Sequence, residues 1–213
     1  MRSVIPEVSN ERDIPWETIA KLISTYNVKE DIKNSWLSEI LTAEELDEYT
    51  YFITDLQKDT KGRARYQTFQ KNWSKLTTDV KRSLHLLPHS NEGIKFGERF
   101  MTITNALYGS KYAYLRTKQY EAFKQGRGLA EKNLTTETIS WLENAVAAYW
   151  QNRIHNILTH VGITPDREVL TLWNLALSDM YGDDKSRHED VYQMILNNYQ
   201  LSPKARTWLE TIR

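Results

Sequence analysis

Histidine is the first residue type to consider for chemistry, because imidazole can act as a general base or bind a metal. His155 and His160 are five positions apart, so in a helix they point to different faces and would not chelate one ion. His188 precedes Glu189 and Asp190 in a stretch typical of a solvated helix start. The histidines therefore indicate neither a metal site nor a site of proton transfer.

The other common signatures of catalysis are also missing. The chain has no cysteine, which excludes disulfides, thiol nucleophiles and thiolate metal sites. The glycine-rich stretch at 126–128 lacks the Lys-Ser/Thr pair and the preceding strand of a phosphate-binding loop, so it is interpreted as a hinge. Carboxylate pairs such as Glu44 and Glu45 fit helix caps. We expect no enzymatic activity, no cofactor and no metal.

Composition narrows the classes of partner. The 28 basic and 28 acidic residues give a formal net charge of +0, without the basic excess that a nucleic-acid-binding surface usually shows. No apolar run approaches the roughly 20 residues of a membrane span. We therefore expect a globular protein that contacts neither nucleic acid nor membrane directly. A cytoplasmic location fits the lack of cysteine, and assembly as a homodimer is left open.

Aromatic side chains are the remaining candidates for a functional site. The chain has seven tryptophans and twelve tyrosines among its 213 residues. Most of them are expected in the core, because packing is the usual role of a large aromatic ring. A surplus lining a cavity would suit a flat, aromatic or amphipathic ligand.

The aromatic residues also mark an internal repeat. Trp73 and Trp150 stand at the same spacing before Pro88 and Pro165. Residues 100–109 and 173–182 are two matching blocks that end in Tyr-Gly, and two later blocks share Trp-Leu-Glu at 141–143 and 208–210. These matches indicate two imperfect copies, 73–145 and 150–213, made by duplication. A seam between such units is a frequent place for a ligand.

Nearly every segment has helical periodicity, and strand signals are almost absent. Asp13 is placed to cap a first helix that begins at Pro15, and Thr42 opens a capping box with Glu45. Proline at the first helical position is expected in the helix after Thr164. Further helices are predicted over 28–41, 42–57, 62–86, 94–108, 111–125, 135–160, 166–181, 185–198 and 202–212.

These elements predict an all-α fold of two imperfectly repeated, globin-like helical units. The helix at 135–160 would close the first unit and open the second, which makes it a long shared helix. The expected organisation is an N-terminal helical lead at 1–41, a first unit at 42–145 and a second, shorter unit at 146–213.

Four blocks resemble a known family: WLSEILTAEELDEYTYF at 36–52, YQTFQKNWSKLTTDV at 66–80, FMTITNALYG at 100–109 and LTTETISWLENAV at 134–146. They are similar to the TipAS-type antibiotic-recognition domain, the all-helical effector-binding domain of some bacterial MerR-type transcriptional regulators. Residues 42–145 match the family's order of helices in full, and 146–213 match all but its first helix. The tandem arrangement is similar to that of albicidin-binding resistance proteins.

The resemblance implies that a bulky, hydrophobic or aromatic compound binds in a cleft between helices of a bacterial cytoplasmic protein. The winged-helix DNA reader and the dimerising coiled coil of the regulators have no counterpart in the chain. The cysteine with which the family captures some thiopeptides also has none, so binding here should be non-covalent. The helix that lines the family's pocket corresponds to Tyr120, Glu121 and Phe123 in the first unit and to Met194 and Asn197 in the second.

Aromatic residues that break the repeat are better candidates for a cavity than those that keep it. Tyr66, Phe69 and Tyr149 have no counterpart in the other unit, whereas packing alone would require an aromatic ring at repeated positions. The expected ligand-binding residues combine both groups with those that the resemblance implies: Tyr66, Phe69, Trp73, Phe100, Tyr108, Tyr120, Glu121, Phe123, Tyr149, Met194 and Asn197.

The sequence therefore predicts a non-enzymatic protein that binds an amphipathic, aromatic small molecule such as an antibiotic or a multidrug-type compound. It would act as a drug-sensing effector domain of a MerR-type transcriptional regulator or as a drug-sequestering resistance protein. The alternative is a helical protein–protein interaction scaffold with no small-molecule ligand. A cavity favours the first interpretation, and a flat exposed apolar patch favours the second.

Overall fold

A computed structural model describes the backbone of residues 16–213 and the side chains of residues 25–213. The cap expected at Asp13 lies outside the described residues. Over 16–213 the structure has nine α-helices, two 3-10 helices and no strand, which confirms the all-α prediction. The elements are α1 Trp16–Lys33, η1 Trp36–Glu39, α2 Ala43–Lys58, α3 Thr60–Arg82, α4 Asn91–Tyr108, α5 Ala113–Lys124, η2 Ala130–Lys132, α6 Thr136–Thr159, α7 Asp166–Tyr181, α8 Lys185–Asn198 and α9 Pro203–Ile212.

Local capping chemistry explains where several helices begin and end. The capping box is confirmed: Glu45 donates its amide to Thr42 Oγ1 at 3.3 Å, and the Thr42 amide donates to Glu45 Oε2 at 2.8 Å. At the other end of a helix, Gly109 and Gly182 follow the Tyr-Gly helices with φ of 63° and 64°. Glycine adopts this left-handed backbone without steric cost, so both helices end at the tyrosine.

Two predicted helix starts were wrong. The structure has no separate helix over 28–41, because α1 continues to Lys33 and a 3-10 turn follows, capped by the side chain of Ser35. No glycine or proline lies between 16 and 33 to end the helix earlier. Pro165 is the residue before α7 and not its first helical residue, since its ψ of 131° is extended.

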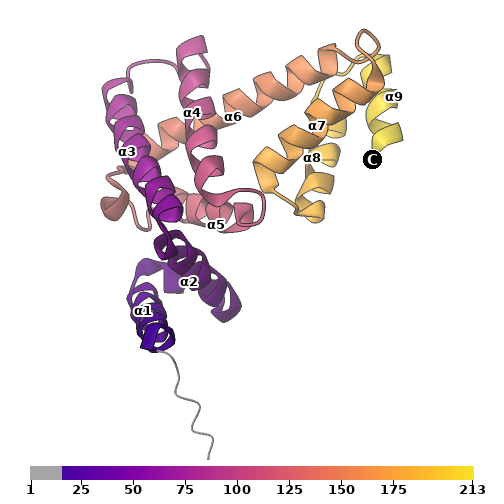
Figure 1. Cartoon of the computed structure of the whole chain (residues 1–213). Coiled ribbons are helices and arrows are strands. Elements are labelled where there is room, and N and C mark those ends of the chain that lie inside the picture. Colours follow the sequence, from indigo (N-terminus) through magenta and orange to yellow (C-terminus); the bar gives the residue numbers. More distant parts are fainter. Residues whose placement is uncertain (1–15) are drawn as a thin grey trace, which may run out of the picture.

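Helix α6 crosses the molecule and joins two groups of helices (Figure 1). The first group consists of α1 to α5, and the second group consists of α7 to α9. Its first half packs on α3, α4 and α5, and its second half packs on α7. The crossing with α4 is close: a Cβ atom on Gly97 would lie 2.3 Å from the carbonyl oxygen of Ala145. Because glycine has no Cβ, the two backbones can approach at this point.

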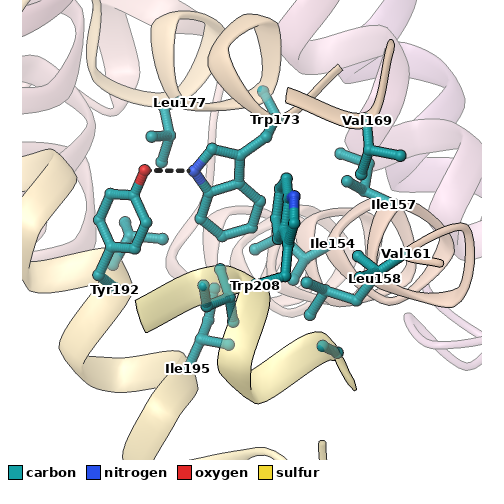
Figure 2. Close-up of a cluster of buried hydrophobic side chains, with 14 residues drawn as sticks. Ile154, Ile157, Leu158, Val161, Val169, Trp173, Leu177, Tyr192, Ile195 and Trp208 are labelled. Atoms are coloured by element: carbon teal, nitrogen blue, oxygen red, sulfur yellow. Dashed lines mark hydrogen bonds between the residues drawn. The ribbon is translucent and has the colours of Figure 1, made fainter. Parts of the chain in front are cut away.

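The buried side chains form three clusters. One lies between α3, α4, α5 and α6 around Leu76, and another lies between α1, α2, α4 and α5 around Phe52. The third joins the end of α6 to α7, α8 and α9 (Figure 2). Its centre is Trp173, which is 1% exposed, donates Nε1 to Tyr192 Oη at 2.7 Å and meets Trp208 edge to face.

None of the helices within residues 16–213 combines the length and the apolar content that crossing a bilayer requires.

Candidate ligand-binding site

A small cavity of about 30 Å³ lies inside the first group of helices. Helices α3, α4 and α5 supply nearly all of its wall, and η2 supplies one residue. Its aromatic wall consists of Phe69, Trp73, Phe100, Tyr108, Tyr120 and Phe123, all of which are among the predicted ligand-binding residues. The structure therefore brings these six side chains together. The polar wall of the cavity consists of Thr104, Arg116, Gln119 and Lys132.

Four of the six aromatic rings of the wall form a continuous chain of contacts. The ring of Phe69 stacks on Trp73 with centroids 5.8 Å apart, and Trp73 lies 5.9 Å from Phe100. Phe100 in turn lies 5.2 Å from Tyr120. Helical spacing places Phe69 and Trp73 on one face of α3, so neighbouring turns present both rings to the cavity. Such a wall offers flat apolar surface to an aromatic ligand.

Two polar groups on the wall lack a hydrogen-bond partner. Tyr108 donates its hydroxyl to Gln119 Oε1 at 3.1 Å, which satisfies that oxygen. Gln119 Nε2 and Tyr120 Oη are buried and pair with no other atom of the described residues. A buried polar group without a partner costs free energy, so these two groups favour an occupant that accepts or donates hydrogen bonds.

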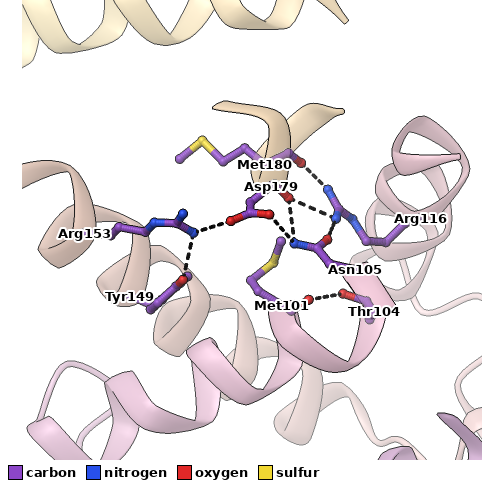
Figure 3. A network of polar contacts seen from close by, with 8 residues as sticks. All are labelled: Met101, Thr104, Asn105, Arg116, Tyr149, Arg153, Asp179 and Met180. Atoms are coloured by element: carbon purple, nitrogen blue, oxygen red, sulfur yellow. Dashed lines mark hydrogen bonds and ion pairs between the residues drawn. The ribbon is translucent and has the colours of Figure 1, made fainter. Parts of the chain in front are cut away.

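Arg116 joins the cavity to the second group of helices. It is 5% exposed, and its guanidinium donates to Asn105 Oδ1 and to the carbonyl oxygens of Asp179 and Met180 at the end of α7 (Figure 3). Burial lowers the pKa of Arg116 to about 10, and nearby Asp179 opposes that shift. The Asp179 carboxylate itself pairs with Arg153 at 2.7 Å.

The cavity shares walls with two larger spaces. A cleft of about 130 Å³ between α4, α5, α6 and α7 shares Phe100, Arg116 and Tyr120 with it. A surface groove of about 260 Å³ beside α1, η1 and α2 shares Gln119 and Lys132. Side chains of these shared residues separate the three spaces. The cleft lies at the seam between the two groups of helices, the kind of place that the repeat predicted for a ligand.

The remaining predicted residues lie away from the cavity. Glu121 lines the seam cleft and pairs with Lys124 at 2.9 Å, and Tyr66 lines the surface groove. Tyr149 lines a different groove and accepts a hydrogen bond from Arg153 at 3.0 Å. On α8, Met194 and Asn197 are exposed and border neither the cavity nor the seam cleft.

Sequence reasoning missed the polar residues of the wall. Arg116 and Gln119 lie on the same helix as Tyr120 and Phe123, at spacings that give them a shared face with Phe123. A buried arginine or glutamine on an apolar helix face is a signal that could have identified them. Lys132 comes from a short 3-10 turn, and no periodic pattern marks its position.

Buried tyrosines beside the cavity predict a loss of stability at high pH. Burial raises the pKa of Tyr49 to about 12, and burial raises the pKa of Tyr108 well above its ordinary value. The unfolded chain releases these protons near pH 10 while the folded chain keeps them. The contribution of these tyrosines to stability should therefore be constant below pH 10 and then fall, by about 1.4 kcal/mol per pH unit for each tyrosine that stays protonated in the folded chain.

Guanidinium-chloride unfolding at pH 8, 9, 10 and 11 measures this dependence. Tyr49→Phe removes one titrating group and should make the decline above pH 10 shallower. A free energy of unfolding that stays level from pH 9 to pH 11 would contradict the prediction.

No three His, Asp or Glu side chains within the described part of the chain gather in a way that could hold a metal ion. Comparisons of the chain with protein families, with curated proteins and with solved structures find no match.

Proposed function

We propose that this protein binds a bulky, amphipathic aromatic small molecule without covalent chemistry, and that the cavity and the seam cleft form the site. The observation that carries the proposal is the convergence of aromatic side chains from α3, α4 and α5 on one cavity with unpaired buried polar groups. Ligand sites combine an apolar lining with a few placed polar groups in this way. The chain contains no cysteine for covalent capture.

Such a ligand must displace side chains when it binds. The cavity of about 30 Å³ has room for water-sized groups, whereas sites for drug-sized ligands measure roughly 300–1,000 Å³. Tyr120 lies on the wall between the cavity and the seam cleft, and its hydroxyl has no hydrogen bond within the described residues to lose. Rotation of this side chain would join the two spaces, so Tyr120 serves as the gate of the site.

The biological role that we propose is drug sensing or drug sequestration. A protein that binds an antibiotic lowers its free concentration, which gives resistance by sequestration alone. In the effector domain of a MerR-type regulator, the same binding would change transcription. Arg116 supports either role, because it touches the site and holds the end of α7, so occupancy can alter the contact between the two groups of helices.

Fluorescence and thermal-shift titrations against a panel of aromatic antibiotics test this function. Trp73 lines the cavity and Trp150 lines the seam cleft, so a bound aromatic compound should quench tryptophan emission. A saturable response should accompany stabilisation that grows with ligand concentration. Trp73→Phe should reduce the quenching amplitude. A panel that produces neither quenching nor stabilisation would contradict the proposal.

Loss of the gate ring should weaken binding of the compound found in that panel. Tyr120→Ala removes the aromatic ring and the hydroxyl that the rotated side chain would offer to the ligand. We expect the affinity to fall by about tenfold, because an aromatic contact contributes up to roughly 1.5 kcal/mol. Tyr51→Ala is the matched control, because Tyr51 is 64% exposed. Isothermal titration calorimetry measures both affinities.

A folded double variant makes that test stricter. Phe123 is 5% exposed and belongs to the core, so Phe123→Leu is preferable to alanine because it keeps most of the side-chain volume. Tyr120→Ala combined with Phe123→Leu should bind more weakly than either single variant. Unchanged affinity in a variant with a native circular dichroism spectrum would remove the site from this cavity.

The second candidate function is a protein–protein interaction scaffold. Exposed apolar side chains on α7 favour it: Leu172 is 46% exposed and Leu175 is 54% exposed, and the two lie one turn apart. Exposed apolar surface of this kind can mark a binding face for another protein. A negative result from the small-molecule panel would favour this function.

We also propose that residues 42–145 and 146–213 are two imperfect, globin-like copies of one helical unit. The order of helices around Trp73 recurs around Trp150, with helix ends at Gly109 and Gly182 of nearly identical φ. Both terminal helices of the copies, α6 and α9, begin with a hydroxyl cap and bury a Trp-Leu pair. Duplication explains why the same side chains recur at the same places.

A further inference from the structure

We propose that the ligand of this site is an anion, an aromatic compound with a carboxylate or an equivalent acidic group. The acidic group binds on the polar wall of the cavity, beside Lys132, Gln119 and Arg116. The inference rests on the proposed function and specifies the class of compound that the same site binds.

The first support is the charge of the cavity wall. Of its ten lining residues two are cationic, Arg116 and Lys132, and none is an aspartate or a glutamate. A cationic ligand would meet like charges in a setting where water screens little, whereas an anion would be attracted by both groups. The chain as a whole is neutral, so this positive character is local to the site.

The second support is the bonding of Arg116. Its guanidinium donates only to neutral acceptors, the Asn105 side-chain amide and two main-chain carbonyls. The nearest carboxylate, that of Asp179, forms its ion pair with Arg153 at 2.7 Å. A buried charge is costly unless an opposite charge compensates it, and here the compensation is incomplete.

The third support is Lys132, which is half-buried and forms no ion pair with any described residue. Burial lowers the pKa of its ammonium group, and neighbouring Glu131 opposes the shift. The Glu131 carboxylate instead accepts a hydrogen bond from Trp36 Nε1 at 2.6 Å. Lys132 lines both the cavity and the surface groove, and the cavity is the space without a lining carboxylate, since Asp31 and Glu131 line the groove.

The fourth support is the set of unpaired donors. Gln119 is 5% exposed, and its Nε2 is without a hydrogen-bond partner in the described chain, as is Tyr120 Oη. The acidic groups near Tyr120, Glu121 and Glu143, each lie 2.9 Å from Lys124, which compensates part of their charge. A carboxylate accepts hydrogen bonds and donates none, which fits this wall.

The experiment compares three naphthalene probes that differ in one substituent, which is anionic, neutral or cationic: 2-naphthoate, 2-naphthalenemethanol and 2-naphthylmethylammonium. Isothermal titration calorimetry at pH 7 and moderate salt gives the three affinities for the full chain. We expect 2-naphthoate to bind at least tenfold more tightly than the cation, with the neutral probe between them. Equal affinities, or tighter binding of the cation, would overturn the inference.

Variants locate the effect. Lys132→Met keeps the aliphatic stem and removes the charge, and it should weaken the binding of 2-naphthoate at least fivefold more than the binding of 2-naphthalenemethanol. Lys132→Gln is a second, polar variant in case methionine disturbs the fold. Lys71→Met is the matched control, because Lys71 is exposed on α3. A preference for 2-naphthoate that both Lys132 variants retain would overturn the role of this residue.

The neutral probe separates this inference from the proposed function. One outcome is that 2-naphthalenemethanol binds, that Tyr120→Ala weakens its binding, and that 2-naphthoate binds no more tightly than 2-naphthalenemethanol. This outcome would support the location of the site and would show that the proposed anionic class of ligand is wrong. If none of the three probes binds, the proposed function fails and the inference fails with it.

Discussion

Replacement of Trp173 with alanine is expected to lower the free energy of unfolding by about 3–5 kcal/mol, the usual cost of removing a large aromatic core side chain. Trp173 is 1% exposed at the centre of the cluster that joins α6, α7, α8 and α9. Its loss leaves a cavity, removes the hydrogen bond to Tyr192 Oη at 2.7 Å and removes the edge-to-face contact with Trp208.

Urea unfolding followed by circular dichroism measures this loss. The control is Leu172→Ala, at the neighbouring position of the same helix, where the side chain is 46% exposed and should contribute little. We expect the control to stay within roughly 1 kcal/mol of the parent chain. A Trp173→Ala variant that is as stable as Leu172→Ala would show that this cluster does not hold the second group of helices together.

Addition of a single methyl group at Gly97 is expected to destabilise the fold by about 1–3 kcal/mol, the range for overpacking a tight contact. The new Cβ would lie 2.3 Å from the Ala145 carbonyl oxygen and 2.9 Å from Tyr149 Cβ, so α4 and α6 would have to move apart. Alanine is a better helix former than glycine by roughly 1 kcal/mol, and the clash must exceed that gain for the prediction to hold.

Thr102→Ala is the matched control for this substitution. Thr102 is exposed on the same helix, so alanine there gains helix propensity without a clash. Thermal unfolding of both variants separates the two effects, with a lower Tm expected for Gly97→Ala and an unchanged or higher Tm for Thr102→Ala. A Gly97→Ala variant with a raised Tm would show that the crossing tolerates a side chain.

Helix positions were predictable from the sequence where local signals agree. The predicted ranges 166–181 and 185–198 coincide with α7 and α8, because Pro165 and Gly182 delimit α7 and the side chain of Asp184 caps the start of α8. The N-terminal region was less predictable. A helix without glycine or proline has no local end signal, and tertiary packing decided that α1 continues to Lys33.

The aromatic part of the site was predictable, and the polar part was not. The internal repeat nominated Trp73 as a recurring aromatic residue and Phe69 as one that breaks the repeat, and the family resemblance implied Tyr120. The positions of the cations depend on the three-dimensional arrangement, since Arg116 packs against the end of α7 and Lys132 approaches the cavity from a turn. Met194 and Asn197 were named only because they match the positions of pocket residues in the family. Here α8 presents both side chains to solvent, so sequence position alone did not place them at the cavity.

Helix α6 contributes buried side chains to a core in each half of the molecule. Its 24 residues span about 36 Å, and Trp141 and Leu142 near one end belong to one core while Ile154 and Leu158 near the other belong to another. Separation of the halves would expose an apolar face of α6 whichever piece retained it. We therefore expect the two halves to unfold as one cooperative unit, in which damage to either of these two cores lowers the stability of both.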